Sequence, residues 1–436
     1  MSLRRTSRFG TRLGALGAAV LLASVPLGPA ASASADDRGV ATGTTAAPTV
    51  EERRLDRDAV REILRRSGFD DVAPGFARAL ERVRSADEAE RVAARHGARL
   101  WQRAVDRAQG RGPAGGELSR DDDRPLYWAR LGMTRALGEW RPAFPLGEAR
   151  RAGLSAALER ASRGQDSVTL PVGHRVKRIV LTGFDPFQLD DDIRRSNPSG
   201  AAALALDGTT VQTAAGPARV EAAVFPVRWG DFAEGTVERT LLPHFRSGPR
   251  RADLFLTVSQ GRPGRFDLER TNGAWRGGYP DNLDVSARGT VPIPAGVPTP
   301  APQPQWTSTT LPYRQLVDAA TGPFPVRDNT AVTEIPAGGA DPVGRPDGPT
   351  PGSTARAGGG GDYLSNEIAY RATLLRDAVG LHAPGGHLHT PVLRFGAGNT
   401  DPATGTVSDP DFVRERMAIT GQVRALLVVA AGTLDR

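Results

Sequence analysis

The sequence predicts an α/β fold: a three-layer α/β/α sandwich with a mostly parallel sheet, preceded by a helical N-terminal domain. Two observations lead to this prediction. From Arg175 onward, short runs of β-forming residues alternate with helical segments, the pattern of a sheet covered on both faces. Before that point, apolar residues recur at helical spacing. The 436 residues are enough for two domains of ordinary size.

Residues 1–35 are predicted to be a signal peptide. They carry a short apolar run at 13–25 and small residues at 33–35 that suit a cleavage site. Four arginines precede the apolar run: Arg4, Arg5, Arg8 and Arg12. The run is too short to span a bilayer comfortably, and no later run is long enough. We therefore expect a secreted or extracytoplasmic protein without a stable membrane anchor. The Arg4-Arg5 pair leaves the twin-arginine route open, although Phe9 stands farther from it than that signal prefers.

The next part of the chain is predicted to be a flexible lead-in at 36–48 and a helical domain at 49–165. Four or five helices are expected from apolar sets such as Val60, Ile63 and Leu64 on one face. This region contains no motif that indicates chemistry, so a structural or docking role is the ordinary expectation. The alternatives are that it gates a site, holds a homo-oligomer or attaches the protein to another surface.

Residues 176–432 are predicted to form the α/β domain. Strands are expected at 178–183, 220–227, 252–259 and 387–393, helices at 201–206 and 366–375, and a final helix and strand between 411 and 431. Two long interruptions, at 291–304 and 337–361, are rich in proline or glycine. Loops of this length are usually functional lids or disordered segments.

Charge and cysteine content exclude several classes of function. The formal charge is +7, but the four arginines of residues 1–35 supply four of these charges and leave +3 for the rest. Arginine is interleaved with acidic residues, which is typical of a solvated helix surface and argues against nucleic-acid binding. The chain has no cysteine, so thiol catalysis, disulfides and thiolate metal sites are excluded. We expect no metal and no cofactor.

Three polar residues fall where the strands of such a sheet end and its helices begin, and they are candidate catalytic residues. Glu269 follows a predicted strand and a glycine-containing turn, Ser365 opens a helix, and His389 lies in a short strand. A serine hydroxyl can attack a carbonyl carbon, a histidine can take and return its proton, and a carboxylate can orient the imidazole. Spacing alone favours ordinary roles: a helix cap, a structural histidine, and an ion pair of Glu269 with Arg270.

Six short segments in residues 176–432 change this view. They are Leu181-Thr-Gly-Phe-Asp-Pro-Phe187 with Asn197-Pro198-Ser199, the stretch QGRPGRFDLERTN from Gln260 to Asn272, Tyr279-Pro-Asp-Asn282, Leu311-Pro-Tyr-Arg314, Tyr363-Leu-Ser-Asn366 and His387-Leu-His-Thr-Pro391. Together they resemble the type I pyroglutamyl peptidases (pyrrolidone-carboxylate peptidases). No single segment is specific, but six in the family's order are hard to attribute to chance.

The resemblance implies roles for individual residues. In that family a Cys–His–Glu triad removes N-terminal pyroglutamate from peptides, so His389 is expected to be the general base and acid and Glu269 its orienting carboxylate. Four residues are expected to bind the substrate: Phe184, Phe187, Gln260 and Arg265. The two phenylalanines would wall the pyrrolidone pocket, with ordinary core packing as the alternative. The expected partner is a peptide with N-terminal pyroglutamate.

Ser365 is the main departure, because it stands where the family has its nucleophilic cysteine. A serine hydroxyl depends wholly on a base and an oxyanion hole for activation. Three explanations stay open: a working serine nucleophile, a slow or inactive site that still binds a lactam ligand, and a deliberate Cys→Ser substitution. The leading hypothesis is an exported hydrolase acting through Glu269, Ser365 and His389; the alternative is a catalytically inactive homologue that binds pyroglutamyl ligands.

Overall fold

The structure is a computed structural model, and it describes residues 47–113, 115–173 and 175–435, which belong to one compact unit. The predicted signal peptide at 1–35 and most of the predicted lead-in at 36–48 lie outside the described residues.

The N-terminal part of the described chain is helical, as its apolar spacing predicts. It holds six α-helices and one 3₁₀ turn: α1 (Val50–Arg53), η1 (Arg54–Asp56), α2 (Asp58–Ser67), α3 (Val72–Glu81), α4 (Ala86–Ala108), α5 (Arg124–Glu139) and α6 (Glu148–Ala161). The sequence predicts four or five helices, and the extra one is the single turn α1. Thr49 caps that turn, since its hydroxyl accepts a hydrogen bond from the Glu52 backbone at 3.2 Å.

A seven-stranded sheet forms the centre of the α/β part, in the order β10-β5-β14-β4-β1-β3-β2. Its strands are β1 (Lys177–Phe184), β2 (Thr210–Thr213), β3 (Gly216–Phe225), β4 (Leu254–Gln260), β5 (Phe266–Glu269), β10 (Val326–Asn329) and β14 (Gly385–Thr390). The pairs β3–β1, β1–β4 and β4–β14 are parallel, whereas β5 runs antiparallel to β14. The sheet is therefore mixed but mostly parallel.

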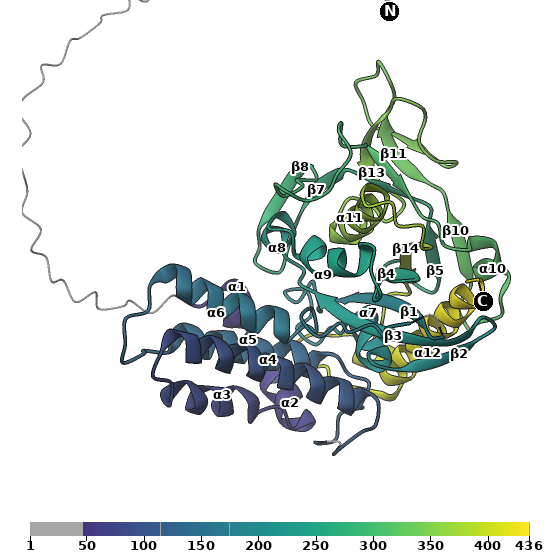
Figure 1. The fold of residues 1–436 in the computed structure, drawn as a ribbon. Coiled ribbons are helices and arrows are strands. Elements are labelled where there is room, and N and C mark those ends of the chain that lie inside the picture. The colour runs from purple at the N-terminus through teal and green to yellow at the C-terminus, as the bar shows by residue number, and fades with distance from the viewer. Residues whose placement is uncertain (1–46, 114, 174, 436) are drawn as a thin grey trace, which may run out of the picture. The chain divides into compact units, whose positions relative to one another are not determined.

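Helices cover both faces of this sheet (Figure 1). They are α7 (Pro198–Leu206) and α12 (Pro410–Gly432) on one face, and α8 (Trp229–Ala233), α9 (Thr236–Phe245) and α11 (Leu364–Ala378) on the other. Successive residues of β1 point to opposite faces, as a strand requires. Ile179 and Leu181 thus lie in one hydrophobic cluster with α7 and α12, and Val180 lies in a second cluster with α9 and α11. The predicted α/β/α sandwich is confirmed.

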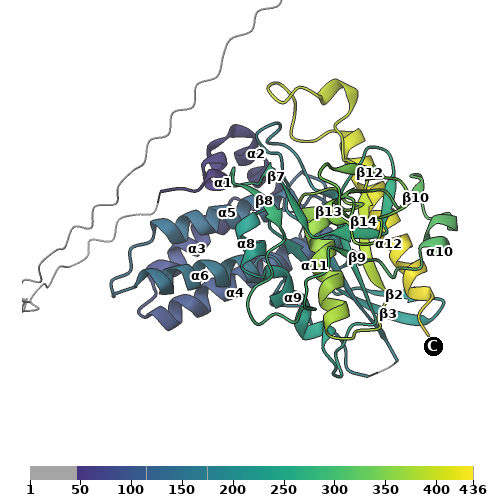
Figure 2. The same ribbon diagram turned by 90° about the horizontal axis from the view of Figure 1, so that it is seen from above.

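The N-terminal helices pack against the α/β part and share the first of these clusters. That cluster contains Phe76 and Leu100 from the helices together with Ile179 of β1. Figure 2 shows α3 to α6 alongside the sheet and its covering helices. At one end of the contact, the Gln109 side chain donates to the carbonyl oxygens of Leu204 at 3.0 Å and Asp207 at 2.6 Å. The helices and the sheet therefore bury a common apolar surface.

The segment 337–361 differs from the loop that its glycine and proline content predicts. Two short strands, β12 (Val343–Arg345) and β13 (Thr354–Ala357), pair with β11 (Val332–Ile335) in a three-stranded antiparallel sheet. Glu334, fully buried, accepts hydrogen bonds from the backbone and hydroxyl of Thr350 at 2.6 Å each. Tight turns and this polar contact give the segment a structure that periodicity alone does not reveal.

Small elements complete the fold. Two further strand pairs are β6 (Thr271–Gly273) with β9 (Trp306–Ser308) and β7 (Trp275–Pro280) with β8 (Ser286–Thr290). Two short helical pieces are α10 (Tyr313–Asp318) and η2 (Ala397–Asn399).

The strand predicted near the C-terminus is wrong, because α12 continues through it. Asp409 caps this helix by accepting from the Phe412 backbone at 2.8 Å, and Ile419, Val423 and Leu427 repeat every four residues on its buried face. Burial of that face outweighs the β propensity of the valine pair at 428–429. Among the described residues, no helix is both long and apolar enough to cross a membrane.

Candidate active site

The structure brings Glu269 and His389 together. Glu269 ends β5 and His389 lies on the adjacent strand β14, where the antiparallel register pairs Glu269 with His387. Residues two apart on a strand share a face, so His389 lies diagonally across from Glu269. The imidazole Nδ1 lies 2.7 Å from the Glu269 carboxylate Oε1, and both side chains are buried. This contact orients the ring and leaves Nε2 for chemistry.

The second carboxylate oxygen of Glu269 is also held. Asn329, which ends β10, donates from its side-chain amide to Oε2 at 2.6 Å and to the Gly359 carbonyl oxygen at 3.1 Å. The Arg262 guanidinium lies 3.8 Å from Oε1. Glu269 is fully buried, so these partners supply the hydrogen bonds and charge that a buried carboxylate needs.

Glycine is required where the chain passes over this pair. A Cβ at Gly359 would lie 2.2 Å from Glu269 Oε2, and one at Gly261 would lie 2.5 Å from the His389 Cβ. At Gly360 the closest atom would be His389 Cε1 at 3.2 Å, followed by the Asn366 backbone at 3.5 Å. The glycine run at 358–361 thus connects the Glu269–His389 pair to the start of α11.

Ser365 lies in the first turn of α11. The first intrahelical bond of this helix is donated by Glu367 N–H to the Tyr363 carbonyl oxygen at 3.0 Å, so the N–H groups ahead of it face the helix N-terminus. The local field there is positive and favours a developing oxyanion. The Ser365 hydroxyl donates to the Gly360 carbonyl oxygen at 3.1 Å. Ser365 and His389 both lie in the part of the chain that the structure describes, and no hydrogen bond joins them.

A small cavity of about 90 Å³ opens beside Ser365. Its lining is Phe184, Phe187, Asn197, Val227, Ser259, Gln260, Tyr363, Leu364 and Ser365. Four residues singled out in the sequence are therefore brought to one cavity: Phe184, Phe187, Gln260 and Ser365. Phe184 also packs in the core, stacked on Phe232 at 6.1 Å between ring centroids.

Arg265 is not among the residues that line this cavity. Its guanidinium donates to both carboxylate oxygens of Asp267 on β5, at 2.9 and 3.2 Å. Asp267 also accepts from Arg262 at 2.9 Å. Asp267 belongs to β5, the strand that ends at Glu269. Arg265 therefore contacts this strand rather than the cavity. Its role in substrate binding stays a prediction.

The comparison with known proteins follows the division of the chain. The family model described as PA0049 N-terminal domain matches residues 30–159, and the model described as PA0049, C-terminal domain matches residues 178–302 and 324–394. The uncharacterized protein PA0049 of Pseudomonas aeruginosa is 36% identical over 502 aligned residues, covering 89% of this chain and 90% of that protein. The chain belongs to the PA0049 family.

Solved structures similar to this PA0049-family chain include two peptidases. A mutant pyrrolidone carboxyl peptidase from Pyrococcus furiosus is 21% identical, with a TM-score of 0.37, over 58% of this chain and 98% of that one. Pyroglutamyl peptidase I of Bacillus amyloliquefaciens is 21% identical, with a TM-score of 0.37, over 59% and 98%. A TM-score this low leaves the site to be judged by its own geometry.

Five residues lining the cavity of this PA0049-family chain were not predicted: Asn197, Val227, Ser259, Tyr363 and Leu364. Four of them lie in, or directly beside, a segment that resembles the peptidase family, and this position could have indicated them. Val227 lies in no such segment. Burial raises the pKa of Tyr363, with a contribution from Asp281, and its hydroxyl donates to the Pro280 carbonyl oxygen at 3.0 Å. Its hydroxyl therefore stays protonated and can keep donating this hydrogen bond.

His387, the other histidine of β14, is buried beside the site. Its two ring nitrogens lie 2.8 Å from the hydroxyls of Thr257 and Ser259, and its ring meets that of His389 edge-on at 4.7 Å. Burial, together with His389, lowers the pKa of His387 well below its usual value. A neutral His387 on β14 thus holds Thr257 and Ser259 of the neighbouring strand β4, and Ser259 lines the cavity. No group of three or more His, Asp or Glu side chains in the described residues is placed to hold a metal ion.

Proposed function

We propose that this protein is an exported hydrolase that removes N-terminal pyroglutamate from peptides. The observation that supports the proposal most is the hydrogen-bonded Glu269–His389 pair, packed against glycine beside a small cavity that Ser365 lines. Two aromatic walls, Phe184 and Phe187, suit a flat lactam ring, and the polar side chains of Asn197 and Gln260 can read its edge.

The proposed reaction is acyl transfer to Ser365. The hydroxyl leaves the Gly360 carbonyl oxygen and gives its proton to His389 Nε2, while Oγ attacks the carbonyl carbon that joins pyroglutamate to the next residue. Free N–H groups at the start of α11 hold the resulting oxyanion. His389 then protonates the leaving amine, and water, deprotonated by His389, releases pyroglutamate from Ser365. Glu269 keeps the imidazole in the required tautomer throughout.

A reporter assay tests this proposal. The mature wild-type protein is incubated with a pyroglutamyl amide that releases a fluorescent amine. The Ser365→Ala and Ser365→Cys variants are assayed in parallel. We expect the wild type to exceed Ser365→Ala by at least about a hundredfold, in line with loss of a nucleophile. Equal rates for these two proteins would contradict a serine nucleophile.

A second function is favoured by the hydrogen bond from Ser365 to Gly360, because the hydroxyl proton is given to this carbonyl oxygen rather than to His389. In this case the cavity binds a pyroglutamyl or related lactam ligand without turnover. Calorimetry with pyroglutamate distinguishes the two: binding without hydrolysis supports the receptor, and activity only in Ser365→Cys shows that the scaffold is competent. If no variant shows either binding or turnover, both proposals are rejected.

Export is proposed on the sequence of residues 1–35 alone. Expression of the full chain in a bacterial host, followed by fractionation and N-terminal sequencing, tests it. The expected product is extracytoplasmic and begins near Asp36. A chain that stays in the cytoplasm with its first 35 residues intact would contradict export.

A further inference from the structure

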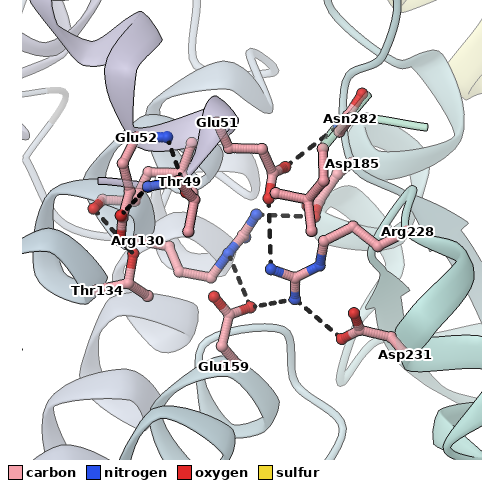
Figure 3. Close-up of polar contacts among 12 residues, drawn as sticks. Thr49, Glu51, Glu52, Arg130, Thr134, Glu159, Asp185, Arg228, Asp231 and Asn282 are labelled. Atoms are coloured by element: carbon pink, nitrogen blue, oxygen red, sulfur yellow. Dashed lines mark hydrogen bonds and ion pairs between the residues drawn. The ribbon is translucent and has the colours of Figure 1, made fainter. Parts of the chain in front are cut away.

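The N-terminal helical region makes buried polar contacts with segments whose residues line the cavity. Two segments carry cavity-lining residues and receive these contacts: 184–187, which includes Phe184 and Phe187, and 196–197, which includes Asn197. We call them the two wall segments. Figure 3 shows the side chains that meet behind the first of them.

Arg130 of α5 holds the first wall segment. Its guanidinium donates to the Asp185 carboxylate at 2.7 Å, and Arg163, just after α6, donates to the same oxygen at 3.0 Å (Figure 3 labels Arg130 and Asp185). All three side chains are almost fully buried. Asp185 lies between Phe184 and Phe187, so a carboxylate fixed by two cations fixes the backbone from which both aromatic walls project.

A second contact reaches the same segment from α1 and η1 through Asn282. The Asn282 side-chain amide donates to the Pro186 carbonyl oxygen at 2.9 Å, and Arg54 donates to the Asn282 carbonyl oxygen at 2.7 Å. Glu51 accepts from Tyr127 at 2.8 Å and lies 3.4 Å from the Asn282 amide. Asn282 therefore joins the first wall segment to the start of the helical region.

Asp123 holds the second wall segment. Its carboxylate accepts from the Asn197 backbone at 2.9 Å and from the Ser196 hydroxyl. The Asn197 side chain in turn donates to the Asp185 carbonyl oxygen at 3.0 Å, which joins the two wall segments to each other. Asp123 is 4% exposed, and without it a buried backbone N–H would lack its acceptor.

We infer that the N-terminal helices shape the cavity, with Asp123 and Arg130 as positioning residues that hold its two wall segments. Neither residue lines the cavity. They act on ligand affinity through Asn197 and Asp185, and the chemistry at Ser365 and His389 does not involve them. As a statement about ligand binding, the inference rests on the proposed function; as a statement about the wall segments, it stands on the contacts alone.

The test compares four variants of the mature chain. Asp123→Ala and Arg130→Met remove the two contacts, and Asp123→Asn keeps an acceptor for the Asn197 backbone. Gln109→Ala is the matched control, because Gln109 also joins a helix to the α/β part but contacts Leu204 and Asp207 rather than a wall segment. Peptide-level hydrogen exchange and pyroglutamate affinity are measured for each.

We expect hydrogen exchange in the two wall segments, 184–187 and 196–197, to rise in Asp123→Ala and Arg130→Met only. In these two variants the affinity for pyroglutamate should fall, or KM for the reporter should rise, by about tenfold or more, and kcat should change less. Asp123→Asn should keep most of the affinity. Unchanged exchange in both variants, or an equal rise in Gln109→Ala, would overturn the inference. Raised exchange in a protein that neither binds nor cleaves the ligand would uphold it and reject the proposed function instead.

Discussion

At the scale of single residues, the Glu269–His389 contact carries the proposed chemistry. Asp267, two residues away on the same strand, is also buried but is bound to Arg262 and Arg265, and the described residues show no hydrogen bond from it to His389. Arg262 lies near both carboxylates, but only Glu269 is hydrogen-bonded to His389, so a variant of each can separate orientation of the imidazole from stability of the strand.

Replacing Glu269 with glutamine should lower kcat for the reporter by roughly a hundredfold or more, with KM little changed. The amide keeps the shape of the side chain, but it loses the charge that stabilises the imidazolium and favours the wrong tautomer. Steady-state kinetics measure the effect, and Asp267→Asn, expected to keep kcat within about threefold, is the control. Equal losses in the two variants would show that only the strand was disturbed.

Asp123 should make the stability of the protein depend on pH. Burial, and then the neighbouring Asp122, raise the pKa of Asp123 from 3.8 to about 7. Because the folded state holds this proton more tightly than the unfolded chain, its contribution to stability is full below about pH 4 and is lost as the pH rises to about 7. Asp123→Asn should therefore lose less stability over this range.

Urea denaturation of wild type and Asp123→Asn at several pH values measures this difference. The comparison isolates Asp123 because Asp207, whose pKa burial raises to about 6, titrates in both proteins. Parallel stability curves for the two proteins between pH 4 and 7 would contradict the prediction.

At the scale of elements, the glycine run at 358–361 packs against Glu269, His389 and the start of α11. Gly359→Ala should lower activity by at least about tenfold, since its Cβ would lie 2.2 Å from the Glu269 carboxylate and displace it from His389. Gly344→Ala in β12 is the control, because a Cβ there meets nothing within 4 Å. Reporter kinetics and thermal melting of both variants provide the measurement; full activity in Gly359→Ala would contradict the packing described.

The sequence predicts β1 and β4 well because each is a continuous buried run. It does not predict β5, a strand of four residues whose conformation depends on pairing with β14 and β10. Sequence order can suggest that Glu269 and His389 meet, but the diagonal contact depends on this register. The contact of Asp123 with Asn197 spans 74 positions and leaves no local signal, so the role of the helices could not be predicted.

At the scale of the whole molecule, the helices and the sheet form one core. The cluster that includes Phe76 and Leu100 is continuous with Ile179 on the sheet and with Ala202 on α7. Removing the helices would expose this apolar surface and leave Asp185 without its two buried cations. The α/β part is therefore expected to need the helices to fold.

A fragment of residues 170–436 should be partly folded, with strong binding of a hydrophobic dye and no cooperative thermal transition, whereas the chain 36–436 should unfold cooperatively. Circular dichroism and dye fluorescence on both proteins make the comparison. A fragment that melts cooperatively and keeps reporter activity would show that the helices are dispensable.

The Glu269–His389 pair comes from two strands, whereas residue 365 comes from a helix and makes one side-chain hydrogen bond, to a backbone carbonyl oxygen. Little of the fold's stability therefore depends on which small side chain occupies position 365. Some serine and cysteine codons differ by a single nucleotide, so one gene can exchange these two residues at position 365 in one step while the Glu269–His389 pair and the cavity persist.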